Sequence, residues 1–353
     1  METLKIALDA MGGDKAPACD VEGAVKALKE HDNLKMILLG DETAIKSELA
    51  KFSGYPEDRL EVVHCSEKIE MAEPPVAAIS SKQDSSIVKG MRMVRKGEAD
   101  AFISAGSTGA ILVGGQVLVG RLKGVERPPL GALMPTEKGM TLLIDCGANV
   151  DARPSWLLQF AEMGSIYVEN VLKIRRPRVA IVNIGAEEEK GNTLVKETFP
   201  LLKEDKAINF IGSIEARDIP AGGADVIVTD AFSGNLILKM YEGTANTIYR
   251  VAKKGLKSSV LGMIGGAIAM KPLKKSLRAF DSKKYGGAPL LGLRGLVVKA
   301  HGSSDGDAIA VAINQCLDFY RQDINGKIKE RMEAEAEHMK ELKRMELRKG
   351  SAE

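Results

Sequence analysis

Aromatic residues are scarce in this chain, at 4% of 353 residues, and its few cysteines are widely scattered. No two cysteines form a Cys-x-x-Cys pair, so we expect reduced thiols and neither a disulfide framework nor a zinc site. No uncharged apolar run approaches the roughly 20 residues that a membrane-spanning helix needs. The first residues lack the basic stretch and apolar run of a signal peptide, so we expect a cytoplasmic protein. The four cysteines are Cys19, Cys65, Cys146 and Cys316.

Familiar motifs for nucleotide, metal and hydrolase sites are also missing. The chain has no G-x-x-x-x-G-K-S/T loop, no G-x-G-x-x-G, no H-E-x-x-H and no G-x-S-x-G. Its four histidines are not paired at ligand spacing, so we expect no metal site. The net charge of +2 argues against a nucleic-acid partner. Cys146 ends an apolar run, but no histidine lies near it in sequence, so we interpret it as a small core residue.

Short aliphatic runs alternate with longer segments of helical period. Hydrophobic residues make up 44% of the chain, and 36 glycines supply turns. The runs are continuously apolar, which is typical of strands buried on both faces of a parallel sheet covered by helices. This pattern predicts an α/β fold. The predicted strands cover Leu4 to Leu8, Met36 to Leu39, Ala101 to Ile103, Thr141 to Ile144, Val179 to Val182 and Val226 to Val228.

Five of these segments end in a polar, glycine-containing turn followed by a helical stretch. In an open parallel sheet, ligands bind outside the carboxyl ends of the strands. Glycine permits close approach of the backbone, and helix amino termini offer N–H groups to anions. One such turn is ordinary turn chemistry, but five together predict a site for a phosphate or an oxyanion. The turns are Asp9 to Asp14, Ser104 to Gly109, Asp145 to Asn149, Asn183 to Gly191 and Asp230 to Asn235.

Two regions depart from this pattern. Residues 250–284 carry ten Lys or Arg against one acid, Asp281, which gives a local charge of +9. Within them, Ser258 to Met270 carries no charge at all. The second region, 327–353, is dense in Lys, Arg and Glu with a thin apolar stripe, which indicates an exposed or pairing helix.

The turns also carry a family resemblance. The run Ile6-Ala-Leu-Asp-Ala-Met-Gly-Gly-Asp14 resembles the opening signature of the bacterial phosphate acyltransferases, the PlsX family of phospholipid synthesis. The similarity spans roughly residues 1–325, in order and without large gaps. It continues through Ser104-Ala-Gly-Ser-Thr-Gly-Ala110, Asp145-Cys-Gly-Ala-Asn-Val-Asp151, Asn183 to Gly191, Asp230 to Asn235, Tyr285 to Leu293 and Lys299-Ala-His-Gly-Ser303.

The resemblance implies a Rossmann-like, doubly wound, mostly parallel sheet, akin to phosphotransacetylases and isopropylmalate-type dehydrogenases. It implies a catalytic domain over 1–326 with a charged helical tail over 327–353. The implied reaction moves a fatty acyl group from acyl carrier protein to inorganic phosphate, without metal or organic cofactor. It further implies a homodimer at the inner face of the cell membrane, where acyl phosphate feeds a membrane glycerol-3-phosphate acyltransferase.

Three residues are the candidate catalytic groups. Lys190 is expected to neutralise phosphate or the developing oxyanion, although three preceding acids make a surface ion pair the alternative. Asn235 and the backbone of Ser233 and Gly234 are expected to donate hydrogen bonds to the same charge. Asp230 is expected to orient its surroundings, because a carboxylate facing phosphate would repel it.

The remaining candidates are expected to bind substrate or phosphate. Asp9 and Asp14 are expected to orient backbone and lysine in the way Asp230 does. His301 is as well explained by a structural histidine that bonds backbone at a strand end. The full set is Asp9, Gly12, Gly13, Asp14, Ser107, Thr108, Gly109, Asn149, Ser233, Gly234 and His301.

Two kinds of surface are expected to meet partners. An acidic carrier protein should dock on a basic surface, for which Arg121 to Arg127, Lys173 to Arg178 and residues 250–284 qualify. The uncharged stretch Ser258 to Met270, within residues 250–284, is predicted to form the tip of a helical hairpin that inserts shallowly into the bilayer. Burial in the core or in the dimer interface is the alternative. The expected membrane contacts are Val260, Leu261, Met263 and Ile264.

Three other functions remain open at this point. A phosphotransacetylase-like enzyme would share the fold and chemistry but use a coenzyme A thioester. A dehydrogenase of the isopropylmalate type would need paired acids for a divalent metal and a nicotinamide site, which these residues do not supply. A non-enzymatic membrane-docking adaptor would rest on residues 250–284 alone.

Overall fold

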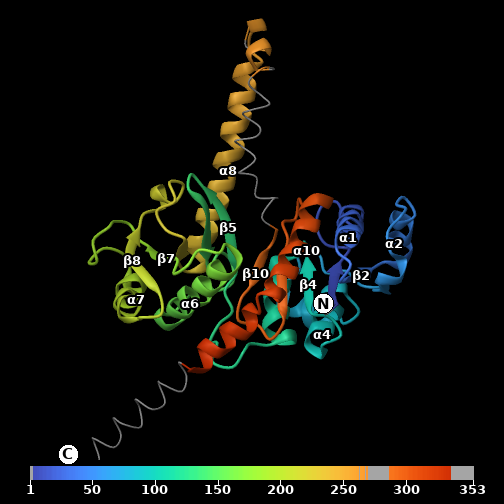
Figure 1. The fold of residues 1–353 in the computed structure, drawn as a ribbon, viewed down its shortest axis with the longest axis horizontal. Helices are drawn as coiled ribbons and strands as arrows, with labels where there is room; N and C mark the ends of the chain where they lie inside the picture. The colour runs from blue at the N-terminus through green and yellow to red at the C-terminus, as the bar shows by residue number, and fades with distance from the viewer. Residues whose placement is uncertain (1–2, 262, 267, 269–285, 335–353) are drawn as a thin grey trace, which may run out of the picture. The chain divides into compact units, whose positions relative to one another are not determined.

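The computed structural model describes residues 3–261, 263–266, 268 and 286–334, and the chain forms two compact units. Unit 1 comprises Met1–Leu130, Glu169–Ile174 and Lys283–Glu353. Unit 2 comprises Gly131–Val168 and Arg175–Ser282. Each unit has its own sheet, and each is described by itself (Figure 1).

The described part of unit 1 is built on a six-stranded sheet with the order β10-β11-β4-β1-β2-β3. All neighbours pair in parallel except β10 and β11, which are antiparallel. Side chains of β1 such as Ile6 and Leu8 are fully buried, as their uninterrupted apolar sequence requires. The strands are β1 (Leu4–Asp9), β2 (Leu34–Gly40), β3 (Leu60–His64), β4 (Ala101–Ser104), β10 (Ala288–Leu290) and β11 (Leu296–Lys299).

Helices between these strands cover the sheet of unit 1. Several begin at a side-chain cap: the carboxylate of Asp41 accepts from the N–H of Ala44, and the hydroxyl of Ser85 accepts from the N–H of Val88. The described helices are α1 (Ala18–Glu30), α2 (Glu42–Leu49), η1 (Glu57–Arg59), α3 (Pro75–Ser81), α4 (Ser86–Lys96), α5 (Thr108–Gly114), η2 (Gly115–Val119) and α10 (Gly306–Arg321).

A further helical stretch follows α10 at residues 324–334. Its apolar side chains Ile324, Ile328 and Met332 are at most 1% exposed. The backbone of Met332 lies so close to Gly124 that a Cβ at position 124 would come within 2.6 Å of its carbonyl oxygen. The first turns of the charged tail therefore pack on their own chain, while residues 335–353 lie outside the described residues.

Unit 2 contains a five-stranded sheet with the order β5-β6-β9-β7-β8 in its described part. Only β5 and β6 among these strands pair antiparallel. The elements are β5 (Gly131–Thr136), β6 (Gly139–Ile144), α6 (Pro154–Val171), β7 (Arg178–Val182), α7 (Thr193–Glu204), β8 (Asn209–Ile214), η3 (Ala216–Asp218), β9 (Val226–Val228) and α8 (Ala231–Leu256).

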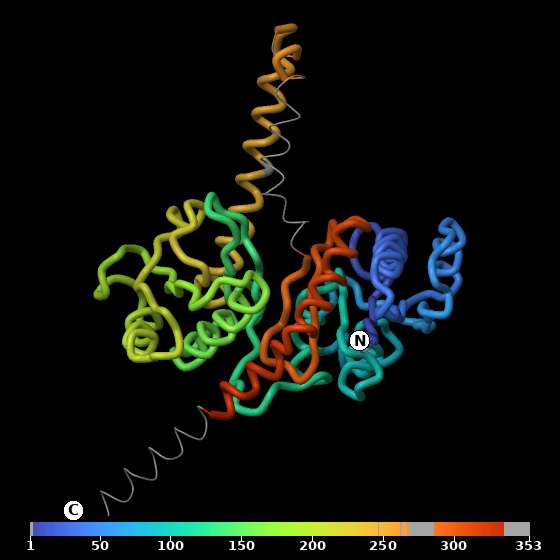
Figure 2. Tube along the Cα trace, viewed as in Figure 1, coloured from blue at the N-terminus to red at the C-terminus, as the bar shows by residue number. Residues whose placement is uncertain are grey.

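Helix α8 projects beyond the rest of unit 2 (Figure 2). Its outer side chains are uncovered in the single chain, with Ile248 63% and Val251 65% exposed. The predicted membrane contacts beyond it are exposed too: Val260, Leu261, Met263 and Ile264. The end of the predicted hairpin tip and everything after it in the hairpin, residues 269–284, lie outside the described residues. Within the described part of the chain, no helix is long and apolar enough to cross a membrane.

The predicted α/β fold with mostly parallel sheets is confirmed, with one such sheet in each unit. All six predicted strand segments fall inside observed strands. The five predicted glycine turns were expected at one site, but the structure divides them between the two units, because two follow strands of unit 1 and three follow strands of unit 2. Within each unit the strands that carry the turns are neighbours. In unit 1 the adjacent strands are β11, β4 and β1, and in unit 2 they are β6, β9 and β7.

Candidate functional site

Asp9 anchors the turns of unit 1 from below. Its carboxylate is 1% exposed, and it ends β1. One oxygen accepts a hydrogen bond from the N–H of Met11 at 3.0 Å. The other accepts from the hydroxyl of Ser104 at 2.6 Å, and that hydroxyl oxygen accepts from the N–H of Gly106 at 3.0 Å. A chain of hydrogen bonds thus ties the turn after β1 to the turn after β4.

Glycine is required where these two turns meet. A Cβ on Gly12 would lie 2.6 Å from the N of Gly106 and 2.7 Å from Oδ2 of Asp9, a separation that real side chains do not tolerate. The turn after β11 joins the same cluster, because the N–H of Asp14 donates to the carbonyl of Gly302 at 2.8 Å. Three sequence-distant turns are therefore fixed against one another at the carboxyl ends of adjacent strands.

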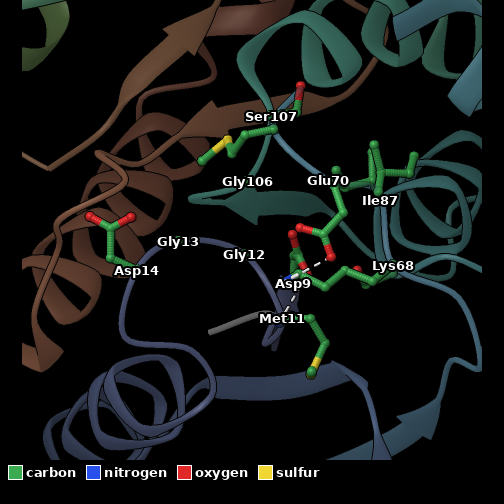
Figure 3. A pocket seen from close by; sticks show the side chains of 13 residues that line it. Asp9, Met11, Gly12, Gly13, Asp14, Lys68, Glu70, Ile87, Gly106 and Ser107 are labelled. Atoms are coloured by element: carbon green, nitrogen blue, oxygen red, sulfur yellow. Dashed lines mark hydrogen bonds and ion pairs between the residues drawn. The ribbon is translucent and has the colours of Figure 1, made fainter. Parts of the chain in front are cut away.

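A cavity of about 200 Å³ opens between these turns (Figure 3). Five of the predicted binding residues line it: Asp9, Gly12, Gly13, Asp14 and Ser107. Sequence reasoning missed the opposite wall, which the segment after β3 supplies. The residues from that segment and from the start of α4 are Lys68, Ile69, Glu70, Met71, Ser86 and Ile87.

Ser107, which is buried, also accepts from the N–H of Ala110 and so caps α5. The other predicted residues of unit 1, Thr108, Gly109 and His301, lie outside the lining of this cavity. Thr108 and Gly109 form the first turn of α5. His301 is exposed, and its Nδ1 accepts from the N–H of Ser303 at 3.2 Å. This local hydrogen bond is what the structural interpretation of His301 expected.

Asp145 holds the first turn of unit 2 by collecting main-chain donors. Its carboxylate is fully buried at the end of β6. It accepts from the N–H groups of Gly147 and Ala148 at 3.0 Å each, and from the N–H of Asn149 at 2.9 Å. The side-chain amide of Asn149 donates to the same carboxylate at 2.7 Å. Asn149, a predicted phosphate donor, is thereby engaged with Asp145.

Asp230 caps the neighbouring helix α8. Its carboxylate accepts from the N–H of Ser233 at 2.9 Å and from its hydroxyl at 2.8 Å. Gly234 is buried against β6, where an added Cβ would lie 1.9 Å from the carbonyl oxygen of Asp145. Asn235 follows on the second turn of α8 and is half-buried. The aspartate therefore orients the start of the helix, in keeping with its expected role.

Lys190 stands on a loop that follows β7. Its ammonium lies 2.8 Å from Oε2 of Glu187, and its side chain is 51% exposed. The hydrogen bond that Lys190 donates to the carboxylate of Glu187 raises the pKa of Lys190, so the side chain stays cationic at neutral pH. Its aliphatic stem lies along Gly185, where a Cβ would come within 2.5 Å of Cδ. The structure thus shows the ion pair that the sequence offered as the alternative, on a side chain that is still accessible.

Asn183 organises the Lys190 loop from within. This residue directly follows β7 and is 6% exposed. Its amide nitrogen donates to the carbonyl of Lys190 at 3.2 Å and to the hydroxyl of Ser213 at 3.1 Å. Its oxygen accepts from the N–H of Ile184 at 2.8 Å. Sequence reasoning quoted Asn183 only as part of a motif. Its place at the end of a buried strand was the available signal.

Two buried groups are poor candidates for chemistry. Burial raises the pKa of the Cys146 thiol well above its ordinary value, which suppresses the thiolate that a nucleophile needs. Asp20 on α1 is fully buried. Its burial, and then the charge of Asp9, raise the pKa of Asp20 well above its usual range. The raised pKa means that this position disfavours a charged carboxylate.

Comparison with known proteins decides the family. A model of the family described as "Fatty acid synthesis protein" matches residues 4–327. A phosphate acyltransferase of Clostridium botulinum is 49% identical over 331 residues, which cover 94% of this chain and 99% of the relative. The chain belongs to this phosphate acyltransferase family. A phosphate acyltransferase of Alkaliphilus oremlandii is 50% identical over 316 residues, covering 90% of this chain and 93% of the relative.

Solved structures extend the likeness of fold beyond this family of phosphate acyltransferases. A phosphotransacetylase from Streptococcus pyogenes superposes with a TM-score of 0.55 at 19% identity, covering 90% of this chain and 94% of that one. A branched-chain phosphotransacylase from Enterococcus faecalis gives 0.54 at 16% identity, covering 90% and 98%. The expected kinship with the phosphotransacetylase architecture is confirmed at the level of fold.

Proposed function

We propose that this phosphate acyltransferase transfers a fatty acyl group from an acyl carrier protein thioester to inorganic phosphate. The observation that carries the proposal is the 49% identity, across 94% of the chain, to a relative named phosphate acyltransferase. The resemblance of the glycine turns to the PlsX signature adds the carrier-protein donor and the acyl phosphate product. Two clusters of such turns at strand ends, one in each unit, are suited to an anionic substrate and a carbonyl group.

The proposed reaction needs little proton chemistry. A phosphate oxygen attacks the thioester carbonyl carbon, which forms a C–O bond and a tetrahedral oxyanion. The oxyanion collapses, the C–S bond breaks, and the thiolate leaves. The proton of the hydrogen phosphate moves to the sulfur, so the products are acyl phosphate and the free carrier thiol. Holding the two reactants in place can supply about 7–11 kcal/mol of the barrier reduction.

Lys190 and Asn235 are the groups we assign to the developing charge. They follow β7 and β9, which are adjacent in the sheet of unit 2. The Lys190 ammonium is cationic and half exposed, so it can exchange its ion pair with Glu187 for an incoming anion. Asp230 positions the first turn of α8 and with it Asn235. One oxyanion donor is typically worth about 3–4 kcal/mol.

A turnover assay tests the proposal. Purified protein is incubated with palmitoyl carrier protein, phosphate and EDTA, and acyl phosphate is trapped with hydroxylamine. We expect phosphate-dependent product and free carrier thiol in equal amounts. Loss of turnover in EDTA that a divalent ion restores would overturn the metal-free part. A clear preference for palmitoyl coenzyme A would reassign the donor to the phosphotransacetylase type.

The same resemblance carries three proposals about partners. We propose that the chain acts as a homodimer, docks the acidic carrier protein on a basic surface and attaches peripherally to the cytoplasmic face of the membrane. Exposed apolar side chains at Leu261 and Ile264, within the positively charged segment 250–284, support the membrane contact. Attachment there would release a labile acyl phosphate beside a membrane-bound glycerol-3-phosphate acyltransferase.

A further inference from the structure

The unit 1 cavity is poorly suited to phosphate. Its lining, all within the described part of the chain, contains the three carboxylates of Asp9, Asp14 and Glu70 and the single ammonium of Lys68. That ammonium already lies 3.6 Å from an oxygen of Glu70 (Figure 3). A phosphate dianion placed here would meet more negative than positive charge, and like charges at short range repel.

Two hydrogen bonds hold the Asp9 carboxylate at the floor of this cavity. Both of its oxygens already accept, from the N–H of Met11 and from the hydroxyl of Ser104. The carboxylate is also almost completely buried, at 1% exposed, so these two hydrogen bonds fix its place. The floor of the cavity is therefore a fixed carboxylate.

The rest of the lining suits an uncharged chain. Met11, Met71 and Ile87 contribute apolar surface, and methionine adapts its shape to a flexible ligand. Ser86 and Ser107 contribute hydroxyl groups that can bond to amides. The volume of about 200 Å³ is below the roughly 300–1,000 Å³ of pockets that enclose a drug-sized ligand, so it fits a segment of a longer molecule.

We propose that this cavity binds the neutral, amide-bearing pantetheine arm of the thioester donor and excludes inorganic phosphate. This inference rests on the proposed function for its substrate, and it divides the predicted binding residues by role. Asp9, Gly12, Gly13, Asp14 and Ser107 then serve the donor arm. Lys68 and Glu70 offer their paired charges to the arm's amide groups at the rim.

Direct binding tests the proposal without turnover. Pantetheine, the arm alone, is titrated calorimetrically into the full-length protein and into Met71→Glu, which places a further charge in the wall. We expect at least tenfold weaker binding to the variant. The matched control is Val76→Glu on α3, an apolar position outside the lining that is also more than half exposed, at 70% against 54% for Met71. Equal binding to wild type and Met71→Glu would overturn the proposal.

Kinetics separates the two substrates. Glu70→Lys makes the lining more positive, so a phosphate site here would show a several-fold lower KM for phosphate. We expect that KM to stay within twofold of wild type while Met71→Glu raises the KM for both acyl-pantetheine and acyl carrier protein about tenfold. A fall in the phosphate KM, or an effect confined to the carrier-protein donor, would overturn the assignment. If wild type shows no acyl transfer, the proposed function fails, whereas the titration still decides what the cavity binds.

Discussion

The side-chain amide of Asn183 donates a hydrogen bond to the main-chain carbonyl of Lys190 at 3.2 Å. The same nitrogen lies 3.5 Å from the carbonyl of Glu187, the ion-pair partner of Lys190. The buried amide of Asn183, directly after β7, thus holds together the loop from Asn183 to Lys190 that presents the proposed catalytic ammonium. We call these contacts of the amide with the loop carbonyls the Asn183 clasp. The clasp therefore fixes the main chain at Lys190.

Asn183→Ala should therefore lower turnover, although the Asn183 side chain acts only through the Lys190 loop and not on the substrate. Losing the clasp frees the loop, and we expect kcat to fall about tenfold, equivalent to ~1.4 kcal/mol. The KM for the acyl donor should stay near that of wild type, which a general loss of folding would not reproduce. Ser213→Ala is the matched control, because it removes a different partner of the Asn183 amide and leaves the carbonyl contacts in place. Equal effects of both variants would contradict the clasp.

Lys190→Ala and Asn235→Ala should each reduce turnover by about a hundredfold or more, as loss of an oxyanion or phosphate donor does. Both side chains are at least partly accessible, so neither substitution opens a hole in the core. Steady-state rates with acyl carrier protein and phosphate give the result, and circular dichroism verifies the fold. Lys203→Ala is a suitable control, since Lys203 forms a comparable exposed ion pair with Glu188. Near-normal rates in both variants would refute the site assignment.

Leu261→Glu combined with Ile264→Glu should release the protein from anionic vesicles. The two side chains are 83% and 57% exposed, so charge is tolerated in the free protein but opposes insertion into lipid. Sedimentation with vesicles containing phosphatidylglycerol measures the bound fraction. A folded double variant that sediments as well as wild type would exclude this segment as the anchor. Val117→Glu, a 70% exposed apolar position in unit 1, controls for added charge.

Asp20→Asn should stabilise the protein at neutral pH. The folded-state pKa of Asp20 is raised, so the folded protein binds a proton that the unfolded chain releases above its ordinary pKa of about 3.9. This group's stability is present below that pKa and is lost as pH rises towards the folded-state pKa. Asparagine keeps the shape without this penalty. We expect the unfolding free energy at pH 7 to rise.

Urea unfolding at pH 5 and pH 7 measures that difference. The gain from Asp20→Asn should be smaller at pH 5, because less of the proton-binding free energy has been lost there. Asp32→Asn supplies the control, since that carboxylate is exposed. A gain that is the same at both pH values would show that packing, not protonation, is responsible.

Sequence reasoning succeeded where strands are buried on both faces. The continuous apolar runs of β1 and β9 mark central strands, and the turns that follow them were identified with them. Strand β3 was missed because it lies at a sheet edge and is only half-buried, with polar residues such as Glu61 interrupting its sequence. Lys68 and Glu70 follow that edge strand, so the wall they form was missed with it.

Roles of polar residues were harder to predict than their location. The sequence placed Asp145 and Asn183 at strand ends but did not show that each turns inward to bind several main-chain groups. Such a partner set depends on the path of the loop, which a single sequence does not specify. The two interpretations of Lys190, surface ion pair and site cation, describe one exposed side chain that can serve in both ways.

The residue at which the family model ends, 327, lies inside a helical stretch that packs on unit 1. The family match stops at residue 327, yet Ile328 and Met332 beyond it are buried, and Met332 closes over Gly124. A chain cut after residue 327 would lose these side chains, uncover the apolar surface of unit 1 on which they pack and leave it open to aggregation. The first residues of the charged tail, up to Met332, are thus part of the packed unit. Substitutions at their buried positions are constrained by packing.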